Sequence, residues 1–284
     1  MSLRELLATG EVVVAAGCFD PLSARVAADA GFEVVYMTGN GTSAVRLGKP
    51  DVGLLTLTEM ADQAGRIAAA VDVPLIADAD TGYGNPLNVI RTVEAYERAG
   101  VAAMHLEDQV MPKKCGHLEG KQLVPAAEHA AKVRAAADAR SDDGVLVIAR
   151  TDAVSVEGVD SAISRARSYG EAGADILFVE GLPTEADITN VVAELGDWPL
   201  VYAWVEGRGP QLRPDQLADL GIRIVIFPIT ALLSTVANLQ RTYRTLLREG
   251  TPTSMLADMA SFEDYSDFMG ASEAAALEEK YGEN

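Results

Sequence analysis

Cysteine is scarce in this chain of 284 residues, which contains only Cys18 and Cys115. Two cysteines are too few for the disulfide framework of a small secreted domain, so the sequence favours a reduced, cytoplasmic protein. Histidine is nearly as rare, and none of the three histidines forms a His-x-x-x-His pair. These shortages argue against a disulfide-stabilised scaffold and against a zinc enzyme.

Basic residues are also few, since 23 lysines and arginines stand against 42 aspartates and glutamates, a formal net charge of −19. A surface of that sign repels phosphate backbones, so we expect no nucleic-acid partner. No apolar run approaches the roughly 18 residues that cross a membrane. The run Val12–Phe19 has the length of a signal-peptide core, but Glu5 and Glu11 precede it where positive charge is needed. We therefore interpret it as a first strand and expect no membrane association.

The chain does contain a repeated alternation of short apolar runs and alanine-rich helical segments. Runs that are apolar almost throughout indicate strands buried on both faces, as in a parallel sheet. About eight units, and no Gly-x-Gly-x-x-Gly motif after the first strand, favour an α/β fold of the (β/α)8 TIM-barrel type over a doubly wound sheet. The predicted strands are Val12–Gly17, Val34–Gly39, Pro74–Asp80, Ala102–Asp108, Val145–Thr151, Ile176–Gly181, Leu200–Glu206 and Ile222–Pro228.

The C-terminal part of the sequence differs from these units. A long helix is predicted over Ala231–Glu249, followed by a Gly-Thr-Pro-Thr break at 250–253. We predict a barrel domain over residues 1–250 and a helical extension over 251–284. The extension carries apolar residues at helical spacing, so its apolar face needs a partner. We expect it to dock on a neighbouring subunit of a homo-oligomer, with packing on its own barrel as the alternative.

Acidic residues gather where the predicted strands end. In a TIM barrel the carboxyl ends of the strands meet at one mouth, which is where active sites lie. Carboxylates crowded there repel one another unless a cation neutralises them, and oxygen ligands select Mg²⁺ first and Mn²⁺ second. We therefore predict a metal site at the mouth, with helix capping or pairing to arginine as the alternative for any single acid. The acids concerned are Asp51, Asp78, Asp80, Glu107, Asp108, Asp152, Glu180 and Glu206.

Two further segments are candidates for chemistry. In Met111–Lys121, Cys115 lies among lysines and a histidine, an environment that favours a thiolate able to exchange a proton. Gly116 and Gly120 would let this segment move as a lid. The glycine-rich turn Tyr36–Thr42 follows the second strand, and its backbone N–H groups could hold a substrate carboxylate. An inert cysteine and an ordinary turn are the alternatives. Cys18, within a strand, is interpreted as a small buried side chain.

Four motifs occur in order at these strand ends: Asp78–Gly84, Glu107–Gln109, Lys113–His117 and Ala149–Asp152. They resemble the Asp-Ala-Asp metal segment, the Glu-Asp-Gln strand end, the Lys-Lys/Arg-Cys-Gly-His signature and the fifth-strand arginine motif of the isocitrate lyase/phosphoenolpyruvate mutase superfamily. The resemblance covers nearly the whole chain and extends to the 2-methylisocitrate lyase and carboxyvinyl-carboxyphosphonate phosphorylmutase groups. It implies a β/α barrel, usually a tetramer of helix-swapped dimers.

The resemblance also implies roles for individual residues. Asp78 and Asp80 would lie near Mg²⁺, with Glu107 and Asp51 completing its shell directly or through water. Cys115 would donate a proton to the departing carbanion. Arg150 would pair with a substrate carboxylate, and a gating loop would carry catalytic residues. The further residues implied at the substrate are Thr38, Gly39, Asn40, Gly116 and Glu180, and the further catalytic ones are Tyr36, Lys113 and His117.

One position departs from the family pattern. Relatives carry an asparagine on the seventh strand, whereas the segment Tyr202–Gly207 has Ala203 there. Loss of an amide that would bond a substrate carboxylate removes roughly 1–3 kcal/mol of buried hydrogen bonding, so we predict altered specificity. The predicted function is a Mg²⁺-dependent lyase that cleaves a 2-hydroxy di- or tricarboxylate, similar to 2-methylisocitrate, into an α-oxo acid and a second carboxylate. A phosphorus–carbon bond-forming phosphorylmutase and an oxaloacetate hydrolase are the alternatives.

Overall fold

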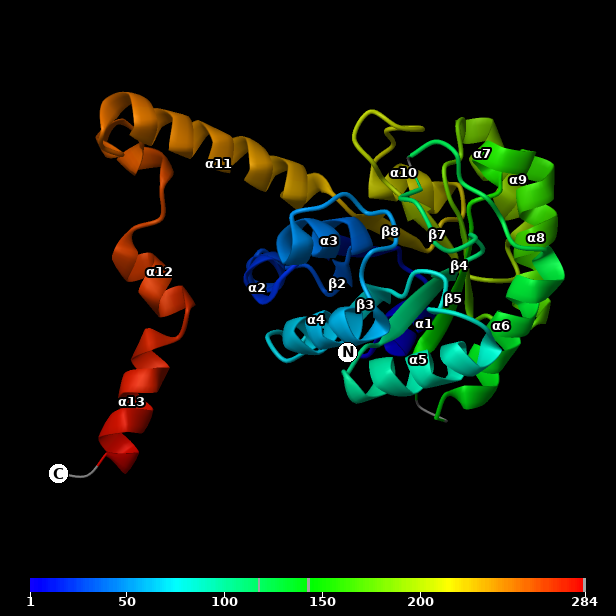
Figure 1. Cartoon of the computed structure of the whole chain (residues 1–284), viewed down its shortest axis with the longest axis horizontal. Helices are drawn as coiled ribbons and strands as arrows, with labels where there is room; N and C mark the ends of the chain where they lie inside the picture. Colours follow the sequence, from blue (N-terminus) through cyan, green and yellow to red (C-terminus); the bar gives the residue numbers. More distant parts are fainter. Residues whose placement is uncertain (117, 142–143, 283–284) are drawn as a thin grey trace. The chain divides into compact units, whose positions relative to one another are not determined.

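Eight parallel strands close into a barrel in this computed structural model, which describes residues 1–116, 118–141 and 144–282 (Figure 1). Each strand pairs with the next along the chain, and β8 returns to pair with β1 through Val13–Ile224 and the following residues. The (β/α)8 TIM-barrel prediction is therefore confirmed. The strands are β1 Val13–Cys18, β2 Val34–Met37, β3 Leu75–Asp78, β4 Ala103–Glu107, β5 Leu146–Thr151, β6 Ile176–Val179, β7 Leu200–Ala203 and β8 Ile224–Phe227.

Helices cover the outside of the barrel, and local sequence explains where they begin and end. Several begin at a side-chain cap, such as Asp20 and Thr56, and α2 and α5 have proline in the first turn. Glycines with positive φ follow α2, α5, α8 and α10, as the Ala-Gly and Leu-Gly pairs predict. The helices of this part are α1 Leu3–Ala8, α2 Pro21–Asp29, α3 Gly39–Leu47, α4 Leu57–Ala68, α5 Pro86–Arg98, α6 Ala126–Ala139, α7 Val154–Glu157, α8 Val159–Glu171, α9 Glu185–Leu195 and α10 Pro214–Asp219.

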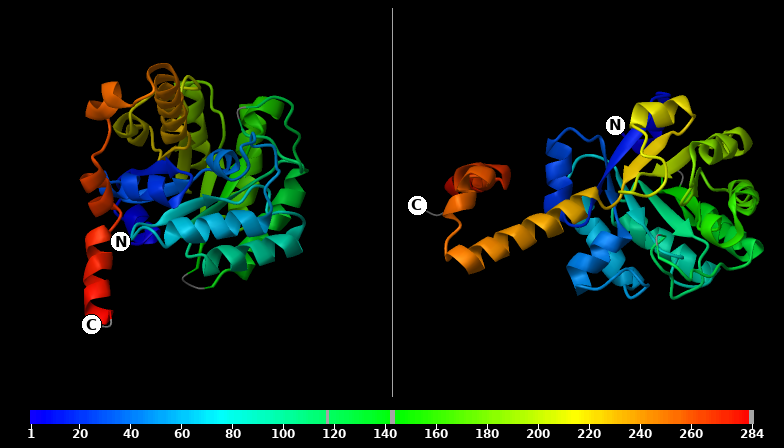
Figure 2. Two further views of the ribbon diagram at one scale, coloured as in Figure 1. Left: turned by 60° about the vertical axis from the view of Figure 1, so that its left-hand side comes forward. Right: turned by 90° about the horizontal axis from the view of Figure 1, so that it is seen from above.

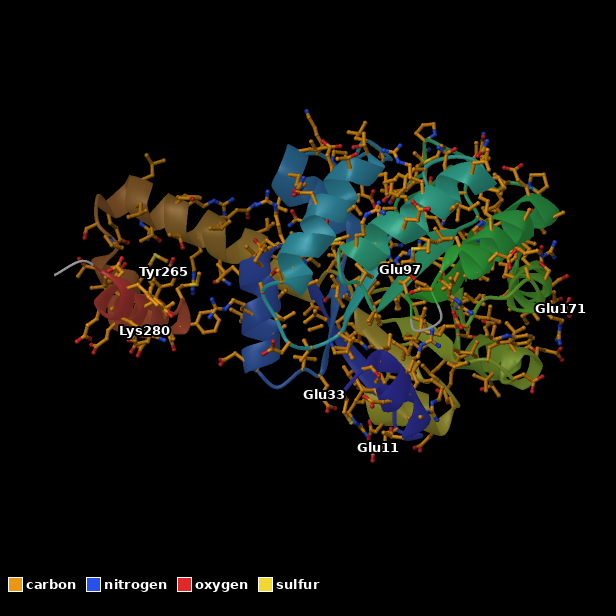
Figure 3. All side chains as sticks on the ribbon, turned by 90° about the horizontal axis from the view of Figure 1, so that it is seen from below. Glu11, Glu33, Glu97, Glu171, Tyr265 and Lys280 are labelled. Carbon is orange, nitrogen blue, oxygen red and sulfur yellow. The ribbon has the colours of Figure 1, made fainter. Side chains whose placement is uncertain are left out.

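Apolar side chains form two layers, one inside the barrel and one between the strands and the helices. Leu3 and Leu6 of α1 belong to the inner layer with the first residues of the strands, such as Val13. Tyr36 and Phe178, near the carboxyl ends of β2 and β6, belong to it as well. Both faces of each strand are thus buried, which is why the strands read as continuous apolar runs. Many acidic residues lie at the surface, among them Glu11, Glu33, Glu97 and Glu171 in Figure 3.

The chain divides into two compact units, Met1–Leu233 and Ser234–Asn284, so the division falls within helix α11 (Thr230–Glu249). The second unit contains the rest of α11, the 3-10 helix η1 (Thr253–Asp258), α12 (Phe262–Phe268) and α13 (Ala271–Tyr281), drawn in orange and red in Figure 2. Arg241 and Asp258 form an ion pair within it. None of the helices described in residues 1–282 combines the length and the apolar character needed to cross a bilayer.

Candidate active site

The predicted site residues meet at the carboxyl ends of the strands, around a cavity of about 40 Å³. Gly39 and Asp80 lie against its walls through contacts with Asp78 and Lys113. His117 lies outside the described residues. The predicted residues that line the cavity are Tyr36, Thr38, Asn40, Asp51, Asp78, Glu107, Lys113, Cys115, Gly116, Arg150 and Glu180.

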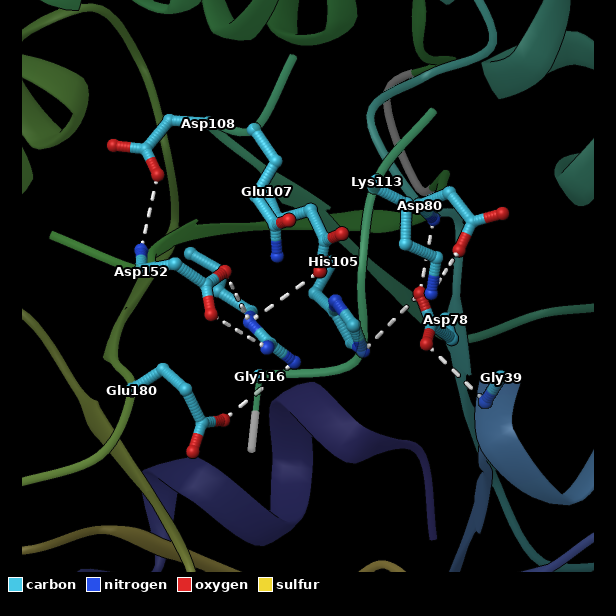
Figure 4. A network of polar contacts seen from close by, with 12 residues as sticks. Gly39, Asp78, Asp80, His105, Glu107, Asp108, Lys113, Gly116, Asp152 and Glu180 are labelled. Carbon is cyan, nitrogen blue, oxygen red and sulfur yellow. Dashed lines mark hydrogen bonds and ion pairs between the residues drawn. The ribbon is translucent and has the colours of Figure 1, made fainter. Parts of the chain in front are cut away.

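Lys113 connects the predicted metal ligands. Its Nζ lies 2.7 Å from Asp51 Oδ1 and 2.7 Å from Asp80 Oδ1, and all three side chains are buried. Asp78 accepts hydrogen bonds from the backbone N–H groups of Gly39 and Asp80, at 3.2 and 2.9 Å (Figure 4). A Cβ at Gly39 would lie 2.3 Å from Asp78 Oδ2, so only glycine allows α3 to begin against this carboxylate. The segment after β2 thus helps to fix the acid that ends β3.

The site holds more negative charge than its cations neutralise. Burial raises the pKa of Glu107 well above its usual value, and burial with Asp78 and Asp51 raises that of Asp80 to about 7 despite Lys113. Within the described residues, Glu107 Oε1 has no hydrogen-bond partner. In their present positions, no three His, Cys, Asp or Glu side chains of the described chain converge closely enough to hold a metal ion. Their carboxylate oxygens and their excess negative charge therefore fit a hard divalent cation, although the side chains are not drawn together around one point.

Arg150, at the end of β5, lies among three carboxylates. Its Nε and Nη2 each donate to Asp152 at 3.0 Å, and it lies 3.5 Å from both Glu107 and Glu180. The guanidinium also stacks over the ring of Phe178, 5.2 Å from its centre. Burial alone would raise the pKa of Asp152, but Arg150 and Lys121 lower it to about 2. Asp152 is therefore a fixed anion that orients the arginine.

The two cysteines have different environments. Cys115 lines the cavity, is half-buried, and its Sγ accepts a hydrogen bond from the Asn40 amide at 3.6 Å. Its backbone N–H donates to the carbonyl of Asp51 at 3.0 Å, so the thiol is tied to the loop that carries a predicted metal ligand. Cys18 is fully buried in β1, and burial raises the pKa of its thiol to about 12. The prediction that Cys18 is a small core residue is confirmed.

His105 is a site residue that the sequence analysis did not predict. Its Nε2 lies 2.7 Å from Tyr36 Oη and 3.7 Å from Asp78 Oδ1 (Figure 4). Burial lowers the pKa of His105 to about 4, so the imidazole is neutral at pH 7. The sequence did contain a signal that could have identified His105. It lies two residues before Glu107 in β4, and alternate residues of a strand share a face.

Four of the eight strand-end acids do not line the cavity, contrary to the expectation that all of them face the mouth. Asp80 and Asp152 are nevertheless in contact with the cavity residues Lys113 and Arg150; Asp108 and Glu206 are the other two. Asp108 is fully buried and binds the end of β5 and helix α8. It accepts hydrogen bonds from Thr151 Oγ1 at 2.7 Å, from Tyr169 Oη at 2.8 Å and from the Asp152 backbone N–H at 3.0 Å. Glu206 has two buried carboxylate oxygens without a hydrogen-bond partner in the described chain. No hydrogen bond or ion pair of the described residues joins either side chain to Asp51, Asp78, Asp80 or Glu107, the carboxylate cluster, so both are removed from the candidate metal ligands.

We expect Asp108→Asn to destabilise the protein by about 3 kcal/mol, because an amide NH₂ would face a donor that now meets a carboxylate oxygen. Tyr169→Phe, which removes a single donor to Asp108, is the matched control and should cost about 1 kcal/mol. Urea unfolding curves with equal slopes would give both values. Equal stability of Asp108→Asn and wild type would contradict the role of Asp108 as an acceptor.

A second, larger cavity of about 710 Å³ adjoins the first. The two share Gly116, Glu180 and Ala203 as walls. Apolar side chains such as Leu118, Val156 and Leu182 line the outer cavity, together with Lys121 and Arg208. Ala203, the position that departs from the family pattern, therefore lies between the small cavity that holds the charged groups and the larger outer cavity.

Comparison with known proteins shows the family of the chain. The family model described as phosphoenolpyruvate phosphomutase matches residues 3–247. The 2,3-dimethylmalate lyase of Eubacterium barkeri is 42% identical over 279 residues, covering 98% of this chain and 96% of that protein. The chloroplastic carboxyvinyl-carboxyphosphonate phosphorylmutase of Arabidopsis thaliana is 42% identical over 275 residues, covering 95% and 81%.

A solved structure of oxaloacetate acetylhydrolase, bound to the inhibitor 3,3-difluorooxalacetate, matches with a TM-score of 0.92 and 38% identity, covering 100% of this chain and 97% of that one. The family predicted from the four strand-end motifs is thus confirmed. The chain belongs to the phosphoenolpyruvate phosphomutase/isocitrate lyase superfamily and is an enzyme of that family.

Proposed function

We propose that the protein is a Mg²⁺-dependent carbon–carbon lyase that cleaves a 2-hydroxy dicarboxylate of the substituted-malate type. The observation that carries the proposal is the small cavity in which Cys115, Arg150 and the carboxylate cluster face one another. It combines a proton donor, a cation for a substrate carboxylate and ligands for a metal. The resemblance to a 2,3-dimethylmalate lyase over nearly the whole of both chains supports the same chemistry.

In the proposed reaction, the bond between C2 and C3 breaks, the C2 hydroxyl loses its proton, and C3 gains one. Arg150 binds a substrate carboxylate and offsets the charge that grows during cleavage. The thiol of Cys115, oriented by the Asn40 amide, donates its proton to the C3 carbanion of the departing carboxylate. The proton of the C2 hydroxyl passes to solvent, and the Cys115 thiolate takes up a proton from solvent before the next turnover. The products are an α-oxo acid and a saturated carboxylate, so atoms and charge balance without an oxidant or a further reactant.

Mg²⁺ would be held by Asp78, Asp80, Glu107 and Asp51, with Mn²⁺ as the substitute. When bound, it would lower the pKa of the C2 hydroxyl and stabilise the α-oxo acid product. The unpartnered Glu107 oxygen and the excess of negative charge among these residues support a divalent cation at this place. Without the metal, Lys113 supplies part of the compensating positive charge, through its contacts with Asp51 and Asp80.

A dicarboxylate is proposed rather than a tricarboxylate because of Ala203. At the boundary between the two cavities, its methyl group cannot hydrogen-bond a third carboxylate. Ile226 and Phe178 add further apolar surface to the inner cavity. An alkyl substituent suits such surface better than an ionised group, which would lose hydration without gaining a partner.

The test is a panel of four substrates assayed with Mg²⁺: 2,3-dimethylmalate, 2-methylisocitrate, oxaloacetate and phosphonopyruvate. Release of an α-oxo acid from 2,3-dimethylmalate, with kcat/KM at least about tenfold higher than for 2-methylisocitrate, is expected from the loss of one buried hydrogen bond. Oxalate and acetate from oxaloacetate alone would favour the hydrolase, and phosphoenolpyruvate from phosphonopyruvate alone would favour the mutase. Either result would replace the proposal.

We also propose that the protein is a homo-oligomer, with its C-terminal extension exchanged between subunits. Truncation after Gly250 is then expected to give smaller or aggregating species, because the apolar side chains of the extension would no longer cover their partner surface. Size-exclusion chromatography with light scattering is the measurement. An unchanged, monodisperse assembly after truncation would contradict the exchange.

A further inference from the structure

Lys121 lies in the loop between β4 and α6, beyond the segment that carries Cys115 and Gly116. Its side chain is only 4% exposed, although lysine ordinarily reaches into solvent. Nζ donates a hydrogen bond to the backbone carbonyl of Gly116 and lies 3.3 Å from Asp152 Oδ1. A single ammonium group therefore joins the loop to the carboxylate that holds Arg150.

The backbone of Gly116 lies directly against Arg150, so the contacts of Lys121 lead back to the arginine. A Cβ added at Gly116 would lie 2.4 Å from Arg150 Nη2 and 3.2 Å from Asp152 Oδ1. Figure 4 shows Gly116 next to Asp152 and Glu180. Arg150, Asp152, Lys121 and Gly116 thus form a ring of successive contacts around one wall of the cavity.

We propose that Lys121 is a positioning residue, which fixes the Cys115–Gly116 backbone over Arg150 and orients Asp152 so that the guanidinium faces the substrate carboxylate. The inference rests on the proposed function for the identity of that carboxylate. Lys121 acts through charge-assisted hydrogen bonds in a buried setting, where such bonds are strong. It also shares the negative charge of Asp152, and without it that charge would be directed wholly at Arg150 and would weaken the attraction of Arg150 for an anion.

The test compares Lys121→Met with Lys121→Arg and with Lys114→Met. Lys114 belongs to the same loop, but its Nζ donates to the carbonyl of Glu119 instead of contacting Asp152, so Lys114→Met is the matched control. The probe is oxalate, whose two adjoining carboxylates resemble the end of an α-oxo acid, titrated calorimetrically in the presence of Mg²⁺. Lys121→Met should weaken oxalate binding by about tenfold or more, the effect of one charge-assisted hydrogen bond. Lys121→Arg should restore it to within about threefold, and Lys114→Met should change it by less than threefold.

A second measurement needs no ligand. The backbone N–H groups of Lys114 and Cys115 donate to Gln109 Oε1 and to the Asp51 carbonyl. Their hydrogen exchange should be about tenfold faster in Lys121→Met than in wild type, because the Gly116 carbonyl has lost this donor and the segment opens more often. The Lys114→Met variant should leave the exchange of the Cys115 amide within about twofold of wild type.

The outcomes separate the two proposals. Wild-type protein that binds no oxalate with Mg²⁺ would contradict the proposed function, while hydrogen exchange would still decide the role of Lys121. If wild type binds oxalate and Lys121→Met binds it equally well, or if its exchange is unchanged, the positioning role is overturned. Equal losses in Lys121→Arg and Lys121→Met would also overturn it, since the arginine retains both the charge and the donors.

Discussion

Cys115→Ser is expected to lower kcat by about 10²–10⁴-fold, the range associated with loss of a general acid, and to leave KM nearly unchanged. A serine hydroxyl fills almost the same space beside Asn40 but is a far weaker acid than a thiol. The carbanion fragment would then lack a proton donor, whereas contacts to the substrate carboxylate through Arg150 would persist. Steady-state kinetics on the best substrate of the panel give both constants.

Cys18→Ser is the matched control for this experiment. Cys18 is buried in β1, and its pKa is raised to about 12, so turnover should stay within about threefold of wild type and iodoacetamide should label Cys115 first. Mass spectrometry of the labelled peptides distinguishes the two sites. Near-normal turnover of Cys115→Ser would reject the proton-donor role and make the hydrolase or the phosphorylmutase the better assignment.

Removal of divalent metal is expected to abolish turnover, and added Mg²⁺ or Mn²⁺ to restore it. Four carboxylates surround one lysine at the end of the barrel, and burial with neighbouring acids raises the pKa of Asp80 to about 7 in the protein alone. A divalent cation would relieve that repulsion and keep Asp80 ionised. Activity measured after exhaustive chelation, together with elemental analysis, tests this expectation.

The variant Asp80→Ala tests the same metal site by removing one of its predicted ligands. It should lose at least about 10³-fold in kcat with Mg²⁺ present, because a lost metal ligand removes charge stabilisation in the transition state. Near-UV circular dichroism should be that of wild type, since Asp80 is a site residue and not part of the apolar layers. Full activity of chelated protein in which no metal is found would refute the metal assignment.

The barrel could be predicted from sequence because its signal is repeated around the fold. Each apolar run was followed by a helical segment, and glycine ended several of the helices, so one misread unit would not have changed the result. Six of the eight predicted strands were too long at their carboxyl ends, as in Pro74–Asp80 against the observed Leu75–Asp78. The last residues leave the strand ladder to bend into the mouth, and Asp80 has a positive φ of 47° there. The first strand instead runs one residue beyond its predicted end, and the fifth ends at Thr151 as predicted.

The site was predicted less completely than the fold. Acids at strand ends are visible in sequence because all carboxyl ends of a parallel barrel share one mouth. Lys121 could not be placed, since its contact with Asp152 depends on how the loop after β4 folds back across β5. Asp108 was misplaced for a related reason: it and Glu107 are neighbours in sequence, but only Glu107 points into the barrel mouth.

Ala203 lies between two regions of the barrel mouth, one that carries the reacting groups and one that forms the outer cavity. The candidate metal ligands, the thiol and the arginine come from the first five strands and their loops, whereas the outer cavity is built largely from segments after β5, β6 and β7, such as Val156, Leu182 and Arg208. Substitutions in those later loops can therefore alter which substituent the enzyme accepts while the reacting groups keep their places. The fold is modular in this respect, and new substrate ranges could evolve or be engineered from one half of the barrel mouth alone.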